Sequence, residues 1–309
     1  MKWHKIGHVY SPKGNKSWAR SHAYIPTAIL RDEYIRVFFA CRDAHQIGRI
    51  GYIDVDTEDP TKILHECDDP VFDIGDPGSF DDNGVSPLSI VQTQSELRLY
   101  YVGWQLGHKV RYFMFTGLAQ SSDGGQSFRR FQTTPILDRC PGERILRSGG
   151  TVHQRDGKWH MWYMAGDQFV EGGSARRPWY LMKHIVSHDG IQWSGESKTC
   201  MTPNVPDEFG FGRPAVVEDA NGRLHMWYSI RTHSKGYRIG YGNSDDASHW
   251  NRCDHQSGID VGPSSWDCET IFAANIVIQN RTAYMFYNGN DYGRTGFGVA
   301  KAKLELQVP

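Results

Sequence analysis

The sequence lacks the spacing patterns of a disulfide framework or a zinc site. Its six cysteines are scattered without a CxxC pair, and its 14 histidines include no HExxH motif. We therefore expect neither disulfides nor structural zinc, because both need ligands at close, regular spacing. Helical periodicity is also hard to find anywhere in the chain, which directs attention to β-structure.

Charge of one sign is not in excess either. The 34 Lys and Arg residues balance 35 Asp and Glu residues and leave a formal net charge of -1. No general attraction to nucleic acid or to an anionic membrane is therefore expected. The amino terminus has no apolar signal-peptide core, and no stretch approaches the roughly 20 apolar residues that a membrane helix needs. These absences predict a cytoplasmic protein.

Short runs rich in aromatic and β-branched residues recur instead, bounded by Gly, Asp, Asn and Ser turns. Aromatic residues make up 13% of the sequence. The clearest of these runs is repeated along the chain, and each copy follows another apolar run and a polar turn, as in a β-hairpin. Its five copies lie at 35–40, 97–102, 159–164, 224–229 and 283–288. The sequence therefore predicts an all-β fold, a five-bladed β-propeller in which these runs are the second strands.

The ends of the chain suggest how the predicted ring closes. The last repeat stops after a third strand at 295–300, whereas a spare strand-like segment, 3–10, precedes the first repeat. If this N-terminal strand joins the last blade as its fourth strand, an exposed sheet edge is removed. We expect residues 1–309 to form a single domain without a linker.

A second repeat marks the ends of the third strands. It reads SSDGGQSF at 121–128, SHDGIQW at 187–193 and SDDASHW at 244–250. These turns resemble the Asp-box of propellers and its shorter S-x-D-G-x-x-W variant. We expect a structural role, in which the Asp caps a tight turn and the aromatic residue packs between sheets.

Polar and charged residues gather where the predicted mouth of the propeller should lie. Adjacent strands run antiparallel, so the start of each inner strand and the end of the following second strand lie on one face of the disc. A mouth lined by carboxylates, arginines, amides and a Trp suits a polyhydroxylated ligand. The residues predicted to bind substrate are His22, Asp81, Trp104, Arg147, Asp167, Arg213, Arg231, Asn288 and Asn290.

Three runs carry a resemblance to a known group. GSFDDNGVSP at 78–87, FGRPAV at 211–216 and MFYNGN at 285–290, with the S-x-D-G-x-x-W turns, resemble the five-bladed β-propeller glycoside hydrolases of families 43, 32, 68 and 130. In architecture the resemblance covers essentially the whole chain. It implies a glycosidase-like enzyme that acts on a carbohydrate or sugar conjugate.

The resemblance also implies catalytic carboxylates. Two are needed, because the glycosidic oxygen is protonated while the anomeric carbon is attacked or stabilised from the opposite side. Asp82 matches the second-blade acid of the group, and Glu143 lies near its third-blade general acid. The first blade departs from the pattern, since residues 20–26 contain no Asp, and Arg147 stands where the Glu would align best. The predicted catalytic residues are Asp82, Glu143, Glu208 and Glu269, with His22 as an alternative base.

The arginines narrow the predicted class of substrate. Arg147 and Arg213 directly precede inner strands, and Arg231 follows a second strand. A guanidinium fork donates two hydrogen bonds to a carboxylate or phosphate, so we expect an anionic sugar: a uronic or ulosonic acid, or a nucleotide- or phosphate-linked sugar. The alternative is that these arginines pair with Glu143, Glu208 and Glu269 and only brace the mouth.

Two other functions stay open. A cytoplasmic transferase or modifying domain in surface-polysaccharide assembly agrees with the missing signal peptide and the missing first-blade Asp. A non-catalytic sugar-binding propeller needs no catalytic pair. No cofactor is expected, although some propellers of the resembling group hold a calcium ion on the axis. The sequence indicates no particular oligomeric state.

Overall fold

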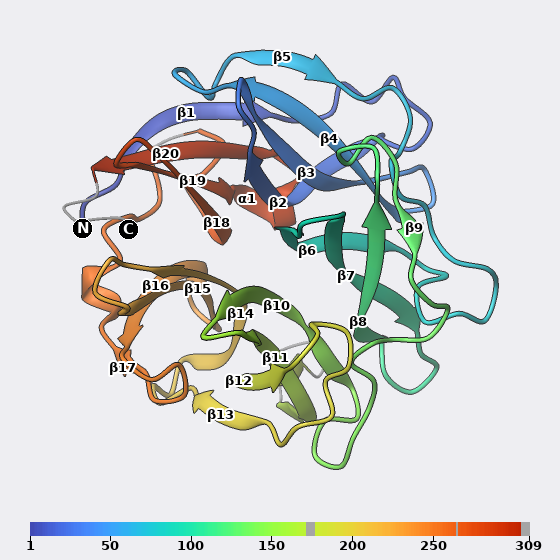
Figure 1. The fold of residues 1–309 in the computed structure, drawn as a ribbon, viewed down its shortest axis with the longest axis vertical. Helices are drawn as coiled ribbons and strands as arrows, with labels where there is room; N and C mark the ends of the chain where they lie inside the picture. The colour runs from blue at the N-terminus through green and yellow to red at the C-terminus, as the bar shows by residue number, and fades with distance from the viewer. Residues whose placement is uncertain (171–176, 264, 304–309) are drawn as a thin grey trace.

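The computed structural model describes residues 1–170, 177–263 and 265–303, and in these ranges the chain is almost entirely β-structure (Figure 1). The helical segments there are the single turns η1 (Asp254–Gln256) and α1 (Asn290–Gly293). No helix in the described ranges is long and apolar enough to cross a membrane. The predicted all-β class is confirmed.

Antiparallel pairing sorts the described strands into five consecutive groups, which we number one to five. Within each of the first four groups the strands pair in chain order. These groups are β2 (Ser21–Leu30), β3 (Tyr34–Arg42), β4 (Gly48–Asp56) and β5 (Ile63–Glu66); β6 (Val85–Gln92), β7 (Leu97–Leu106), β8 (Tyr112–Ser121) and β9 (Arg129–Arg130); β10 (Leu146–Arg155), β11 (Lys158–Val170), β12 (Arg177–Ser187) and β13 (Lys198–Met201); and β14 (Glu208–Glu218), β15 (Leu224–Thr232), β16 (Gly236–Ser244) and β17 (Asn251–Arg252).

The fifth group combines both ends of the chain. It contains β18 (Phe272–Gln279), β19 (Thr282–Asn288) and β20 (Phe297–Lys303), and β1 (His4–Tyr10) pairs antiparallel with β20. The ring of Tyr10 lies 4.7 Å from that of Phe39 and 6.0 Å from that of Phe297. The N-terminal strand β1 is therefore held beside β20 by ladder hydrogen bonds and by aromatic packing.

In Figure 1 the first strand of each group lies toward the centre of the molecule and the fourth toward its rim. The aromatic second strands stand between them. Each contributes two adjacent aromatic residues with at most 2% of their surface exposed: Phe38 and Phe39, Tyr100 and Tyr101, Trp162 and Tyr163, Trp227 and Tyr228, Phe286 and Tyr287. Adjacent side chains on a strand point to opposite faces of the sheet, so each group is covered on both faces. Each buried ring stabilises the fold by about 1.5–3 kcal/mol.

The three Asp-box turns have the geometry expected of them. In the turn after β12, Asp189 Oδ1 accepts hydrogen bonds from the backbone N–H groups of Ile191 and Gln192, both at 2.8 Å. The aromatic residue of each turn packs edge-on against a ring of the preceding group: Phe128 on Phe38, Trp193 on Tyr100, and Trp250 on Trp162. The turns thus join neighbouring groups.

Replacing Asp189 with alanine should lower the free energy of unfolding by about 1–2 kcal/mol, because two backbone N–H groups lose their acceptor. Urea unfolding would measure the loss. Asp189→Asn, which keeps an acceptor oxygen, is the matched control and should lose less. Because this turn follows the end of β12, whereas the start of β12 faces the central cavity described below, ligand binding should not change. An unaltered unfolding midpoint in Asp189→Ala would contradict the structural role.

Candidate functional site

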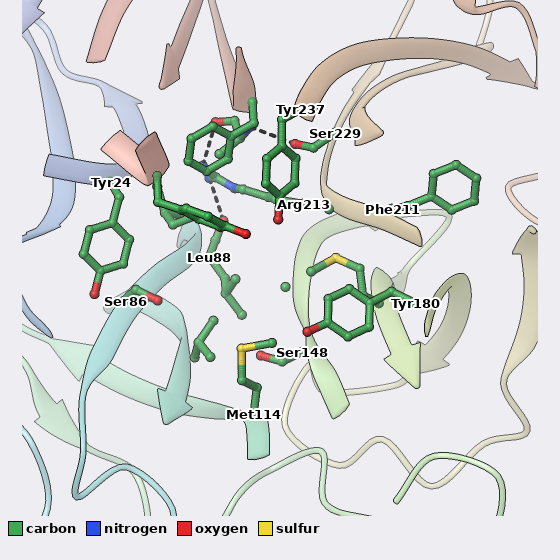
Figure 2. Close-up of a pocket in the computed structure, with 18 of the residues that line it drawn as sticks. Tyr24, Ser86, Leu88, Met114, Ser148, Tyr180, Phe211, Arg213, Ser229 and Tyr237 are labelled. Atoms are coloured by element: carbon green, nitrogen blue, oxygen red, sulfur yellow. Dashed lines mark hydrogen bonds between the residues drawn. The ribbon is translucent and has the colours of Figure 1, made fainter. Parts of the chain in front are cut away.

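An inner cavity opens at the centre of the molecule, where first strands begin and second strands end (Figure 2). All five groups contribute to its wall, and it encloses about 820 Å³, including space open to solvent. Labelled lining residues in Figure 2 are Tyr24, Ser86, Leu88, Met114, Ser148, Tyr180, Phe211, Arg213, Ser229 and Tyr237.

An outer cavity adjoins the inner one. The two share Tyr24, Arg42, Trp104, Tyr112 and Tyr292 as lining residues. The outer wall adds mainly polar side chains, among them His22, His45, Gln46, Asn83, Arg111 and Asp291. Together the two cavities therefore offer a ligand both hydrogen-bonding groups and aromatic surface.

Arg213 lies at the floor of the inner cavity and connects inner strands of several groups. It starts from β14, and its Nη1 donates to the carbonyl of Pro26 at 2.5 Å and that of Ala273 at 3.5 Å. Its Nη2 donates to the Thr27 hydroxyl at 3.0 Å and to the Leu88 carbonyl at 2.7 Å. Burial lowers the pKa of Arg213 to about 9, and its buried Nε has no hydrogen-bond partner among the described residues.

The central position does not fit a calcium ion. Calcium binds oxygen ligands such as carboxylates and backbone carbonyls. Here the Arg213 guanidinium already donates hydrogen bonds to the carbonyls of Pro26 and Leu88, and its positive charge would repel a cation. Nowhere in the described part of the chain do three or more His, Cys, Asp or Glu side chains gather as a metal site.

Arg231 is the second buried guanidinium of the inner cavity. It stands near the end of β15, 6% exposed, with its guanidinium carbon 4.1 Å from the ring centre of Tyr180 and 4.4 Å from that of Phe209. Nη1 donates to the Pro178 carbonyl at 2.9 Å, and the buried Nε has no hydrogen-bond partner in the described ranges. No ion pair forms between Arg231 and a described carboxylate.

The carboxylate expected as a general acid lies elsewhere. Glu143 is 1% exposed, and its Oε2 accepts from Arg147 Nε at 2.6 Å and from the Tyr163 hydroxyl at 2.9 Å. Oε1 accepts from Lys183 at 2.6 Å and Ser197 at 2.8 Å. Neither Glu143 nor Arg147 lines the two cavities. Glu143 and Arg147 therefore pair with each other outside the cavities, in agreement with the alternative that such arginines brace the mouth.

The same arrangement recurs in four groups. A second-strand tyrosine donates its hydroxyl proton to a carboxylate that a Lys or Arg also contacts, because a phenol buried between groups needs an acceptor. The four sets are Tyr101, Asp81 and Arg130; Tyr163, Glu143 and Arg147; Tyr228, Asp254 and Arg252; and Tyr287, Asp267 and Lys5. Glu208 joins the third set through Arg252. The carboxylates of Asp81, Glu143 and Glu208 are thus taken up in structural pairs.

The other predicted residues divide between the cavity wall and the surrounding scaffold. Trp104 lines both cavities, and His22 lines the outer one. Burial, aided by Arg42, lowers the pKa of His22 to about 4, so this imidazole is neutral at pH 7. Asp82 accepts from Gly78 N–H and Asn83, Asp167 pairs with Arg144, and Glu269 is exposed; none of the three lines the cavities.

Asn288 and Asn290 are buried in backbone hydrogen bonds rather than turned toward a ligand. Asn288 donates to the carbonyls of Ala23 and Gly296 and accepts from Ile25 N–H at 2.7 Å. Asn290 Oδ1 accepts from the N–H groups of Glu269 and Thr270. Their amides hold loops in place.

Sequence reasoning missed a set of tyrosines on the cavity wall. Tyr112, Tyr180 and Tyr237 stand within the first four residues of the third strands β8, β12 and β16, and all three line the inner cavity. The hydroxyls of Tyr112 and Tyr180 lie 2.9 Å apart. A third strand begins on the face where the second strand ends, so a tyrosine repeated at that place was the available signal.

Comparison with known sequences identifies a relative that matches this chain over nearly its whole length. No family model matches it. The uncharacterized protein MT1551 of Mycobacterium tuberculosis (strain CDC 1551 / Oshkosh) is 33% identical over 301 residues, which are 97% of this chain and 99% of that protein.

Solved structures share the fold at lower identity. A glycosyl hydrolase from Bacteroides ovatus is 16% identical, with a TM-score of 0.74 over 100% of this chain and 96% of its own. A structure from work on GH130 mannoside phosphorylases and hydrolases acting on β-1,2-mannosidic linkages of Candida mannan is 15% identical, with a TM-score of 0.74 over 99% and 95%. The predicted resemblance to propeller glycoside hydrolases is confirmed for the fold, and by its sequence the chain belongs to the same family as the mycobacterial protein MT1551.

Proposed function

We propose that this protein binds an anionic sugar or sugar conjugate in its central cavity. We also infer that residues 1–309 form one five-bladed propeller domain, in which the five strand groups are the blades and β1 completes the ring. The pairing of β1 with β20 and the cavity shared by all five groups support this architecture.

The observation that carries the proposal is uncompensated positive charge. Arg42, Arg213 and Arg231 line the inner cavity, and none of its described lining residues is Asp or Glu. A buried charge without a counter-ion is costly, and two of these guanidiniums keep an Nε without a partner in the described ranges. A carboxylate or phosphate group would supply the missing negative charge, which the planar fork of a guanidinium binds well.

The sugar part of the proposal rests on the cavity walls and on the fold. Aromatic side chains line the inner cavity and give apolar surface to a sugar ring, whereas the polar outer wall offers donors and acceptors to its hydroxyls. The structural neighbours are glycoside hydrolases, which supports a carbohydrate-active protein.

A glycosidase is the second candidate, and the shared fold favours it. Hydrolysis by the usual mechanism needs two carboxyl groups roughly 5–9.5 Å apart on either side of the bond. None of the described residues that line the inner cavity carries a carboxyl group, and Glu143 and Glu208 are held in ion pairs. The geometry therefore favours binding, or transfer chemistry in which the ligand brings its own leaving group, over two-carboxylate hydrolysis.

Calorimetric titration with matched sugars tests the proposed function. Glucuronic acid and glucose 1-phosphate should bind at least 10-fold more tightly than glucose, because only the first two carry a negative charge for Arg42 and Arg231. Equal affinities for the three would sink the anionic ligand. Turnover of aryl-glycosides that is lost in a folded Glu143→Gln variant would favour the glycosidase instead.

A further inference from the structure

The turn after β19 passes through three consecutive left-handed residues. Asp291 has φ 51° and ψ 54°, Tyr292 has φ 54° and ψ 37°, and Gly293 has φ 79°. Only glycine takes this conformation without steric cost, because the Cβ of other L-residues approaches the following carbonyl. The chain therefore holds two residues in strain at one point.

Surrounding contacts hold this turn in place. Asn288 donates to the carbonyls of Ala23 and Gly296, which flank the turn, and Asn290 accepts from the backbone of Glu269 and Thr270. A Cβ on Gly293 would lie 2.6 Å from the Ala23 carbonyl oxygen, so the turn is pressed against β2. The hydrogen bonds of the two amides offset the strain.

Strained backbone is concentrated around the mouth. Eleven non-glycine residues of the described ranges have positive φ, and six of them line the inner or outer cavity: His22, Ile25, Gln46, Ala273, Asp291 and Tyr292. Ile25 is β-branched, for which this conformation is rarest. Strain of this kind persists where the surrounding structure imposes it, and it clusters at ligand sites.

The strained turn presents an exposed aromatic ring. Tyr292 lines both cavities and is 52% exposed, unlike the buried tyrosines of the second strands. Its ring meets Tyr237 edge-on at 5.4 Å and Phe272 at 6.0 Å. The ring therefore stands beside Tyr237 and Phe272, where the outer cavity meets the inner cavity that Arg231 lines.

We propose that the left-handed turn holds Tyr292 as the aromatic platform on which the sugar ring of the ligand packs while its anionic group reaches Arg231. This inference rests on the proposed function. A ring fixed before binding loses little conformational freedom when the ligand arrives, so the platform adds to affinity and selects ligands that carry a ring next to the anion.

Two probes separate the platform from the anion site: glucose 1-phosphate, which has a sugar ring, and inorganic phosphate, which does not. Tyr292→Ala should weaken glucose 1-phosphate binding about 5- to 10-fold and leave inorganic phosphate binding unchanged. Tyr292→Phe keeps the ring and should bind both probes like the wild type. Asp291→Gly relieves strain and should raise the melting temperature of the ligand-free protein by about 2 °C.

The outcomes distinguish the platform from the proposed function. Wild-type protein that binds neither probe overturns the proposed function and the platform with it. Binding that Arg231→Ala abolishes but Tyr292→Ala leaves unchanged overturns the platform alone. Equal losses in Tyr292→Phe and Tyr292→Ala would also overturn it, because the hydroxyl and not the ring would then make the contact. An unchanged or lower melting temperature in Asp291→Gly would show that the turn is not strained and would overturn its role in holding Tyr292.

Discussion

The Arg231→Ala variant should bind glucuronic acid about 30-fold more weakly than the wild type, or worse, and should unfold at the same or a higher temperature. Losing one partner of a buried, hydrogen-bonded charge pair costs about 2–5 kcal/mol, of which 2 kcal/mol is already about 30-fold in affinity. Removing a buried guanidinium without a described counter-ion and with an unpartnered Nε should offset the loss of the Pro178 hydrogen bond and of the packing on Tyr180 and Phe209, so the stability of the free protein should not fall.

Two further variants control this prediction. Arg177→Ala removes an exposed guanidinium that also lies over the Phe209 ring, at 5.1 Å, but does not line the described cavities, so it should bind like the wild type. Arg231→Lys keeps the charge without the planar fork and should lose less than alanine. Unchanged glucuronic acid affinity in Arg231→Ala would show that the anion lies elsewhere.

Replacing Glu143 with alanine should lower the free energy of unfolding by about 3–5 kcal/mol. The substitution leaves Arg147 and Lys183 without their shared carboxylate and takes the acceptor from Tyr163. Removing one member of a buried ionic set leaves an uncompensated charge, which is the costly case. Urea unfolding measures the loss. Glu196→Ala, an exposed substitution nearby, is the matched control and should stay within about 0.5 kcal/mol of the wild type.

The same carboxylate should make stability depend on pH. Burial alone would raise the pKa of Glu143, but Lys183, Arg147 and Ser197 outweigh it and hold the pKa below the ordinary 4.5. Because the folded pKa is lowered, the stability from this group is complete above pH 4.5 and is lost as pH falls through the lowered pKa. As the pH falls from 4.5 through the lowered pKa, the free energy of unfolding of Glu143→Ala should decrease less than that of the wild type. A Glu143→Ala protein as stable as the wild type but without turnover would make the residue catalytic.

The all-β class and the positions of the strands could be predicted because their signals are local. A group covered on both faces needs apolar residues at consecutive positions, which is why the pairs Phe38–Phe39 and Trp162–Tyr163 appear as continuous aromatic runs. The Asp-box turns are equally local, since Asp189 caps backbone groups two and three residues ahead. Strand existence and turn chemistry therefore follow from neighbours in the chain.

The site could be predicted only in part, because a shift of one position along a strand moves a side chain to the opposite face of the sheet. Ser148 lines the inner cavity, whereas Arg147 beside it turns away to Glu143. Arg213 and Arg231 were placed at the mouth by the same reasoning and do line it. Bulges near the starts of β2, β10 and β14 shift the alternation there, so sequence position alone could not separate these cases.

The chain's own pattern of aromatic runs, turns and end segments was therefore enough for the all-β class, the repeat and the place of the N-terminal strand beside the last one. Which charged groups meet one another was decided only by the tertiary structure. Tyr101, Asp81 and Arg130, or Tyr287, Asp267 and Lys5, come together from distant parts of the chain. Buried polar groups must find partners in space, so several of the predicted carboxylates pair with cations of the scaffold, while the arginines at the centre have no counter-ion among the described residues.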